Sequence, residues 1–238
     1  DVNASATLRL LTLAKKCKIK RFIYVSSSEV YGTAKDVPMT ENHPTLPHTV
    51  YGASKLAGEC YARAFWDTYK YPTIVVRPFN TYGPRCHHEG DSGEVIPKFM
   101  LRAMAGKPML VFGDGLQTRD FTFVEDTAAG IIKAGCCGRA VGETLNLGSG
   151  HEINMKELAG IIATIVGNPD SKIEFIDERP GDVKRLIADT RKASDILGFK
   201  IKTDFQRGLK KLNDWYKQSQ LNPEQLLRDE LERNWIVK

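Results

Sequence analysis

The sequence predicts an α/β protein with a mostly parallel sheet, and three observations lead to that class. Short apolar runs alternate with longer amphipathic stretches along the 238 residues, which is typical of α/β folds. The apolar runs are continuous, as expected for strands that are buried on both faces. The content of 42% hydrophobic and 26% charged residues is that of a globular protein, with either one large domain or two lobes.

The expected elements follow each other in a regular order. Residues 3–16 carry Leu8, Leu11 and Ala14 at helical spacing and predict a helix. The next run, RFIYVSS at 21–27, is short, apolar and rich in aromatic residues, and predicts a buried strand. Further helices are expected over 50–69, 95–105, 124–136, 154–166 and 189–197, with two more closing the chain, and further strands over 73–78, 109–113, 144–148 and 172–177.

Capping signals mark the start of two of these helices. Asn154 is followed three residues later by Glu157, which resembles a capping box. Asn222 precedes Pro223, so the last helix is expected to begin with an Asn cap and a proline at its first position. A break in composition over 85–94 (RCHHEGDSGE) predicts a flexible loop, a candidate lid over a ligand.

The composition excludes several classes of function. The net charge of +5 is mild: it permits anionic ligands, and no basic run is long enough to indicate nucleic acid. No apolar stretch is long enough to cross a bilayer. The five cysteines form no CxxC pair, which favours reduced thiols in a cytoplasmic protein. His87 and His88 are adjacent on a glycine-containing loop, a pattern of exposed histidines, and no metal site is predicted.

The strongest chemical signal is the segment Tyr51-Gly-Ala-Ser-Lys55 at the start of the expected helix 50–69. Residues i and i+4 share one helix face, so this spacing places an ammonium beside a phenol. A free phenol titrates near pH ~10, and a neighbouring cation stabilises the phenolate and lowers that pKa. Tyr51 can then exchange a proton with a substrate hydroxyl. Taken alone, such a pair is equally typical of a solvated helix face.

A second signal lies at the end of the expected strand 21–27, where serines run from Ser26 to Ser28. Catalytic residues of open α/β sheets gather at the carboxyl ends of strands. A serine at this place can hydrogen-bond the hydroxyl that Tyr51 deprotonates, although serine runs also occur as turn chemistry. The strand, the serines and the Tyr–Lys pair in this order form a more specific pattern than any one of them.

With these segments the sequence resembles the extended short-chain dehydrogenase/reductase family, in its NAD-dependent nucleotide-sugar epimerase/dehydratase branch. Six segments carry the resemblance in the family's order: VSSSEVYG (25–32), YGASK (51–55), RPFNTYGPR (77–85), VIPKF (95–99), GDGLQTRDF (113–121) and RPGDVKRLIAD (179–189). The resemblance implies a Rossmann-like doubly wound parallel sheet with a smaller mixed α/β substrate-binding lobe. Residues 1–85 would form the C-terminal part of the NAD-binding domain. Residues 86–238 would form mainly the nucleotide-sugar-binding lobe, with returning Rossmann elements.

The resemblance also implies roles for individual residues. The implied catalytic residues are Ser27, Glu29, Tyr51 and Lys55, with Tyr51 as the acid–base group and Lys55 tuning it. The implied cofactor is NAD, bound by Asn3, Tyr51, Lys55, Pro78 and Phe79. The implied partner is a nucleotide-diphosphate sugar, bound by Ser28, Asn80, Val95, Ile96, Phe112, Arg119, Arg179 and Asp182.

Several of these substrate residues fit other interpretations. Arg119 and Arg179 would hold the diphosphate, a role suited to a guanidinium fork. Arg119 beside Asp120 is equally consistent with a surface ion pair, which contributes little to stability. Ile96 and Phe112 fit a hydrophobic core, and Asp182 fits the cap of a turn.

One departure from the family pattern is large. The family opens with a strand and a GxxGxxG turn that cradles the cofactor pyrophosphate at a helix N-terminus. No segment here matches it, since GDG (113–115) and GSG (148–150) lack the spacing. The chain is therefore expected to lack the first part of the enzyme, with some of its core strands, which puts NAD binding by this chain alone in question.

The implied reaction is C4 epimerisation of a nucleotide-linked sugar of the UDP-glucose/galactose type, through a transient 4-keto sugar. Family dehydratases place an Asp-Glu pair where this chain has Ser28-Glu29, which disfavours 4,6-dehydration. Family decarboxylases of UDP-glucuronate carry Ser-Glu there and a run like residues 80–85, so decarboxylation stays open as an alternative. The stretch Arg119-Asp120-Phe121 favours the epimerase.

An alternative of another class is a non-catalytic fragment that binds nucleotide sugars. The family forms homodimers by packing two helices per subunit into a four-helix bundle. Those helices would be residues 3–16 and 50–69 here, so the resemblance implies a homodimer.

Overall fold

The computed structural model describes residues 1–90, 93–228 and 230, and the chain divides into two compact units. Unit 1 comprises Asp1–Thr81, Arg119–Glu152 and Val183–Lys202. Unit 2 comprises Tyr82–Thr118, Ile153–Asp182 and Thr203–Lys238. Each unit is therefore assembled from three separate stretches of the chain. No helix in the described part is both long and apolar enough to cross a bilayer.

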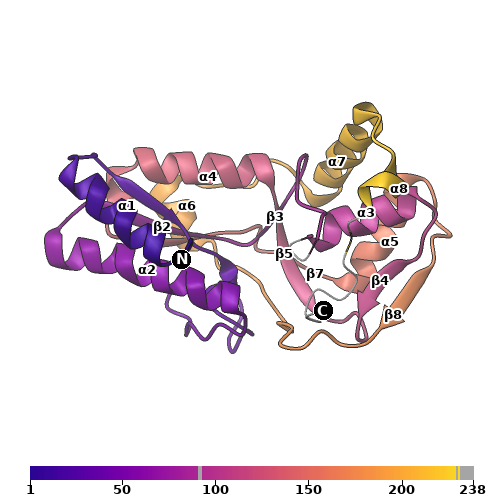
Figure 1. Ribbon diagram of the computed structural model, residues 1–238, viewed down its shortest axis with the longest axis horizontal. Coiled ribbons are helices and arrows are strands. Elements are labelled where there is room, and N and C mark those ends of the chain that lie inside the picture. Colours follow the sequence, from indigo (N-terminus) through magenta and orange to yellow (C-terminus); the bar gives the residue numbers. More distant parts are fainter. Residues whose placement is uncertain (91–92, 229, 231–238) are drawn as a thin grey trace. The chain divides into compact units, whose positions relative to one another are not determined.

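Unit 1 is built on a parallel sheet with the strand order β1-β2-β6, as the sequence predicts for the fold class. The strands are β1 (Phe22–Val25), β2 (Thr73–Pro78) and β6 (Thr144–Leu147). Helices α1 (Ser5–Lys16) and α2 (Val50–Tyr69) lie on one face, and α4 (Val124–Cys136) and α6 (Arg191–Leu197) on the other (Figure 1). The sheet thus has helices on both faces, which is the doubly wound arrangement.

The central strand β2 shows how the sheet is buried on both sides. Successive side chains of a strand point to opposite faces. Val75 accordingly packs with Tyr24 and the residues of α1 and α2. Ile74 and Val76 pack on the other side, in a cluster that includes Ala134 of α4. A continuous apolar run is therefore the sequence that this strand needs, and the expected bounds of 73–78 are confirmed.

Caps explain where the helices begin. The Thr49 hydroxyl accepts a hydrogen bond from Gly52 N at 3.0 Å, which starts α2 at the expected residue. The expected cap by Asn154 is confirmed at α5 (Met155–Val166), where Asn154 Oδ1 accepts from Glu157 N at 2.8 Å. Asn222 likewise caps α8 (Pro223–Leu226), with Pro223 at its first position.

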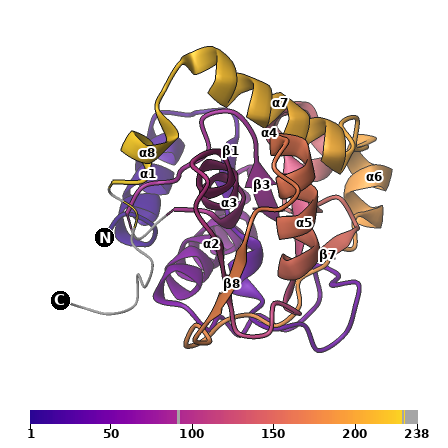
Figure 2. The same ribbon diagram turned by 90° about the vertical axis from the view of Figure 1, so that its right-hand side faces the viewer.

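Unit 2 combines helices with a small parallel pair of strands. Strand β4 (Met109–Phe112) pairs with β8 (Ile173–Ile176). Helix α3 (Val95–Met104) packs on α5, and α7 (Phe205–Ser219) also packs on α5 (Figure 2). This unit carries the C-terminal helices α7 and α8.

Three strands were not expected from the sequence. They are β3 (Asn80–Tyr82), β5 (Thr118–Phe123) and β7 (Glu152–Asn154), which form a sheet in the order β3-β5-β7. In β5 polar and apolar residues alternate over 120–123, but Asp120 and Thr122 are as buried as Phe121 and Phe123, so the strand has no exposed polar face there. Two short 3₁₀ helices, η1 (Ser28–Val30) and η2 (Gly138–Ala140), were not expected either.

Candidate active site

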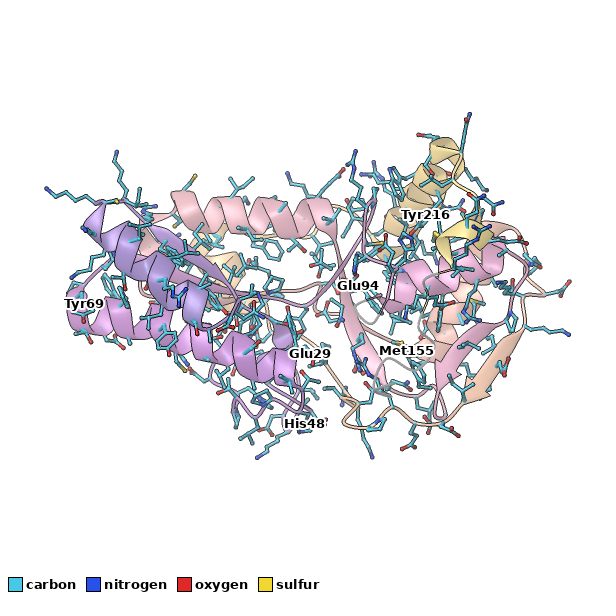
Figure 3. The ribbon with its side chains drawn as sticks, in the orientation of Figure 1. Glu29, His48, Tyr69, Glu94, Met155 and Tyr216 are labelled. Carbon is cyan, nitrogen blue, oxygen red and sulfur yellow. The ribbon has the colours of Figure 1, made fainter. Side chains whose placement is uncertain are left out.

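The predicted catalytic residues lie in unit 1, where β1 ends and α2 begins. Ser27 follows β1 and caps η1, its hydroxyl accepting from Glu29 N at 3.2 Å. Thr49, the cap of α2, donates to Glu29 Oε2 at 3.4 Å. Figure 3 shows Glu29 beside the first turn of α2, whereas Tyr69 lies at the far end of that helix. The strand end, η1 and the start of α2 therefore meet at one place.

A glycine allows this close approach of η1 to α2. A Cβ atom on Gly52 would lie 2.6 Å from the Glu29 backbone oxygen and 3.0 Å from Pro47 Cβ. Any side chain at this position would push the first turn of α2 away from η1. The glycine inside the YGASK segment therefore keeps Tyr51 next to the strand-end residues.

The Tyr–Lys pair has the arrangement that its spacing predicts. Lys55 Nζ lies 5.8 Å from the centroid of the Tyr51 ring and donates to Val25 O at 3.1 Å. Partial burial lowers the pKa of Lys55, while the Tyr51 side chain is 50% exposed. A cation beside a phenol favours the phenolate, so the pair is suited to proton exchange with a ligand hydroxyl.

A second set of contacts holds the first two turns of α2. Asn3 Nδ2 donates to Ser54 Oγ at 3.0 Å, and Ser54 Oγ donates to Tyr51 O at 2.7 Å. Tyr24 Oη donates to Lys55 O at 3.0 Å. Burial, with the nearby Glu59 carboxylate, raises the pKa of Tyr24 to about 12, so this phenol stays a neutral donor. Asn3, predicted to bind the cofactor, therefore contacts the catalytic helix directly.

The other site residues predicted in unit 1 differ in exposure. Phe79 and Ser28 are 1% and 3% exposed, and Pro78 is half-buried. Asn80 is half-buried, and its Oδ1 atom is buried with no hydrogen-bond partner in the described part of the chain. A buried acceptor without a donor is costly, so Asn80 Oδ1 fits a donor from a ligand or a water. The roles of these residues stay predictions.

Five substrate residues were predicted in unit 2, and they lie in three places. Val95 and Ile96 open α3, and Ile96 is 1% exposed, the burial of a core residue. Phe112 ends β4. Arg179 is exposed in the turn after β8, where Asp182 N donates to Arg179 O at 3.1 Å. Their contacts with a nucleotide stay predictions.

Asp120 corrects one interpretation of the sequence. A surface ion pair between Arg119 and Asp120 is wrong, because Asp120 is 0% exposed. Its carboxylate accepts four hydrogen bonds: from Ser149 N at 2.7 Å, Ser149 Oγ at 2.6 Å, Gly150 N at 2.9 Å and Ala188 N at 3.1 Å. Arg119 instead donates to a backbone carbonyl, that of Val183.

The buried ion pair of unit 1 was not expected from the sequence. Glu59 of α2 and Arg77 of β2 are 0% and 1% exposed and bond to each other. A signal was available, because Arg77 interrupts the apolar run TIVVRP and a charge in a buried strand needs a partner. Glu59, four residues after Lys55 on α2, was the acid in position to pair with it.

A Rossmann-like sheet, a serine at a strand end and a Tyr–Lys pair on the next helix define the class of short-chain dehydrogenase/reductase proteins. A family model described as GDP-mannose 4,6 dehydratase matches residues 1–212. The chain belongs to this NAD-dependent nucleotide-sugar epimerase/dehydratase family, as its motifs predict.

Curated relatives differ in the reaction that their names give. The low-salt glycan biosynthesis protein Agl12 of Haloferax volcanii is 35% identical over 219 residues, which is 91% of this chain and 68% of that protein. The dTDP-D-glucose 4,6-dehydratase of Bos taurus is 31% identical over 92% of this chain and 61% of its own length. The UDP-glucose 4-epimerase of Mycolicibacterium smegmatis is 34% identical over 91% of this chain and 68% of that enzyme. The chain thus spans about three fifths to two thirds of the length of these relatives.

Solved structures show the same fold. An epimerase of Methanothermobacter thermautotrophicus superposes with a TM-score of 0.87 at 36% identity, covering 94% of this chain and 66% of that one. The dTDP-glucose 4,6-dehydratase of Bacillus anthracis, solved in complex with NAD, has a TM-score of 0.84 at 32% identity and covers 91% and 68%. The Rossmann-like fold is confirmed, and NAD is confirmed as a cofactor bound within the family.

Proposed function

We propose that the protein is an NAD-dependent nucleotide-sugar 4-epimerase of the UDP-glucose type. One observation carries the proposal: the Lys55 ammonium lies 5.8 Å from the Tyr51 ring and 3.1 Å from the carbonyl of Val25, two residues before Ser27. A proton-exchanging phenol, its cation and a strand-end hydroxyl thus belong to one corner of unit 1. The relatives that act on UDP-glucose at C4 support the choice of reaction.

The residues present fit one end of NAD. Lys55 and Tyr51 are accessible at the carboxyl end of the sheet, where open α/β folds bind nucleotides. A GxxGxxG turn for the pyrophosphate does not occur in these 238 residues, so the fit concerns the nicotinamide ribose. When bound, NAD supplies the hydride acceptor and donor of a redox-neutral epimerisation.

Residues of this chain would transfer the proton of the C4 hydroxyl. Tyr51 accepts the proton of the C4 hydroxyl as that carbon is oxidised. It returns the proton after the 4-keto sugar has rotated in the site and presents its other face. The Ser27 hydroxyl hydrogen-bonds the same oxygen. The positive charge of Lys55 favours the phenolate form of a neighbouring phenol. The enzyme therefore needs no external acid or base.

Dehydration is the second candidate, because the family model and several relatives are 4,6-dehydratases. Such a reaction needs an acid to protonate the leaving hydroxyl. The position next to Ser27 carries Ser28, which is no acid and is only 3% exposed. Glu29 Oε2 accepts from Thr49 instead, at 3.4 Å. Residues 28 and 29 therefore favour epimerisation, with decarboxylation of UDP-glucuronate as a further alternative.

Replacing Tyr51 by phenylalanine tests the catalytic assignment. In the full-length protein, Tyr51→Phe is expected to lower kcat by about 10²–10⁴-fold, because it removes the acid–base group. Binding of the nucleotide sugar, measured by calorimetry, should stay close to that of the wild type. Tyr61→Phe is the matched control, since Tyr61 is another partly exposed tyrosine of α2. Unchanged turnover in Tyr51→Phe would contradict the assignment.

The products distinguish the reactions. The full-length protein is incubated with UDP-glucose, dTDP-glucose or UDP-glucuronate, and the products are identified by NMR. A C4 epimer supports the proposal. A 4-keto-6-deoxy sugar would establish dehydration, and carbon dioxide from UDP-glucuronate would establish decarboxylation. Binding without turnover of any of them would establish a non-catalytic binder.

The predicted homodimer is part of the proposal. Helix α1 exposes the apolar side chains of Leu8, Leu10 and Leu13, which are 38%, 55% and 55% exposed. It packs beside α2, so the two helices together offer a face for a four-helix contact. Sedimentation over a range of concentrations tests this, and a monomer throughout would contradict it.

A further inference from the structure

Beneath the candidate site, unit 1 contains a buried ion pair to which the proposed mechanism gives no role. Arg77 Nε donates to Glu59 Oε2 at 3.0 Å, and Arg77 Nη2 donates to Glu59 Oε1. The contact is bidentate and almost completely buried, which is the strong form of such a pair. It joins α2 to β2 at the carboxyl end of the strand.

The carboxylate of this pair also holds the end of β1. Ser26, 4% exposed, donates from Oγ to Glu59 Oε2 at 2.9 Å. Side chains alternate along a strand, and Tyr24 packs on the α2 side, so Ser26 continues on that side. Ser26 lies between Val25, whose carbonyl accepts from Lys55, and Ser27.

Helix α2 therefore contacts the end of β1 through two neighbouring hydrogen bonds. Lys55 and Glu59 are four residues apart and share one face of the helix. The ammonium of the first binds Val25 O, and the carboxylate of the second binds Ser26 Oγ. Any shift of Ser26 would move both the carbonyl that anchors Lys55 and the backbone of Ser27.

Arg77 also bonds two residues that follow η1 in the chain. Its Nη1 donates to Tyr31 Oη at 2.7 Å and to Glu41 O at 3.0 Å. Tyr31 Oη in turn donates to Asn146 Oδ1 of β6 at 2.7 Å. The ends of β1, β2 and β6 and the residue after η1 are therefore linked by one hydrogen-bonded network.

We propose that Ser26, with the Glu59–Arg77 pair, acts as a positioning residue for Ser27 and Lys55. The inference rests on the proposed function, since it assumes that these two residues serve the reaction. Ser26 itself is 4% exposed, and its hydroxyl is directed to the Glu59 carboxylate. Its effect should therefore be seen in kcat more than in KM.

The test compares two variants of the full-length protein. Ser26→Ala removes the bond to Glu59. Thr73→Val removes an equivalent bond, because the buried Thr73 hydroxyl joins the opposite end of β2 to α2, donating to Ala62 O at 2.7 Å. Ser26→Ala is expected to lower kcat about tenfold, which corresponds to ~1.4 kcal/mol in the barrier, with KM nearly unchanged. Thr73→Val is expected to leave both constants near the wild-type values.

The outcomes separate this inference from the proposed function. A wild-type kcat in Ser26→Ala, or an equal loss in both variants, would overturn the positioning role. Ser26→Cys keeps a weak donor of similar size and should give a kcat between those of alanine and serine. A cysteine variant no better than alanine would also count against the inference. If Tyr51→Phe retains full activity, the proposed function fails instead.

Discussion

Two carboxylates in unit 1, Glu59 and Asp120, are both 0% exposed, but their charges are compensated in different ways. Glu59 is paired with the guanidinium of Arg77, which is buried as deeply. Within the described part of the chain, Asp120 accepts from three backbone amides and from the hydroxyl of Ser149, and from no guanidinium. Burial raises the pKa of Asp120, and the four donors oppose that rise.

The difference shows two uses of a buried charge. A guanidinium has five donors and reaches partners on several elements, so the Glu59 pair links three strand ends and α2. Backbone amides are fixed in their own segment, so Asp120 holds the shape of the turn at 148–150 and its contact with Ala188. The first arrangement positions elements relative to one another, and the second shapes a loop.

The largest expected effect comes from leaving one buried charge alone. Arg77→Met should lower the free energy of unfolding by about 3–5 kcal/mol, because Glu59 would stay buried without its guanidinium. Urea denaturation measures this. The control is Arg63→Met, since Arg63 contacts the same carboxylate at 3.4 Å but is 41% exposed, and should cost less than ~1 kcal/mol. If both variants lost the same free energy of unfolding, the buried pair would contribute no more than the partly exposed contact.

A smaller loss of unfolding free energy is expected at Asp120, whose charge is compensated by backbone amides. Asp120→Asn keeps one acceptor oxygen and turns an amino group toward amide donors, so it should cost about 1–3 kcal/mol. Asp114→Asn is the control, because the exposed Asp114 also accepts from a backbone amide, that of Leu116, at 2.9 Å. A loss in Asp120→Asn as large as that in Arg77→Met would erase the distinction between the two sites.

The smallest effect on stability is expected at Asp189, because its guanidinium partner, Arg191, is exposed to solvent. The side-chain bonds from Arg191, which is 81% exposed, lower the pKa of Asp189. This contribution is present above the unfolded-state pKa of ~3.9 and is lost as the pH falls through the lower folded-state value. Asp189→Asn should therefore remove less than ~1 kcal/mol of stability near pH 6 and less still near pH 2. Urea melts at both pH values check it, and a difference that grows with acid would contradict it.

The sequence predicted those elements whose signals are local. Helix α2 begins where Thr49 caps it, and β2 ends at a proline, so both were placed with their observed bounds. The Tyr51–Lys55 contact also follows from helical spacing alone.

The elements that were missed depend on distant partners. Strand β5 buries Asp120, and this is possible only because Ser149, Gly150 and Ala188 supply donors from elsewhere in the chain. No local pattern contains that information. Arg77 differs in part: its place in the apolar run TIVVRP signals a buried charge, but its partner Glu59 lies 18 residues earlier.

The two edge strands of the unit 1 sheet, β1 and β6, differ in what bonds the backbone groups along their outer sides. Along β6, the carboxylate of Glu41 accepts from Asn146 N at 2.8 Å and so occupies a backbone donor on that side. Strand β1 has a strand neighbour on one side only among the described residues, and on the other side the carbonyl of Val25 accepts from Lys55 Nζ at 3.1 Å. Backbone groups that stay unpaired along such an edge are a template for pairing with another chain. Concentrated preparations of this chain on its own are therefore expected to aggregate through residues 22–25, with Lys18 and Lys20 as the nearby charges that oppose it.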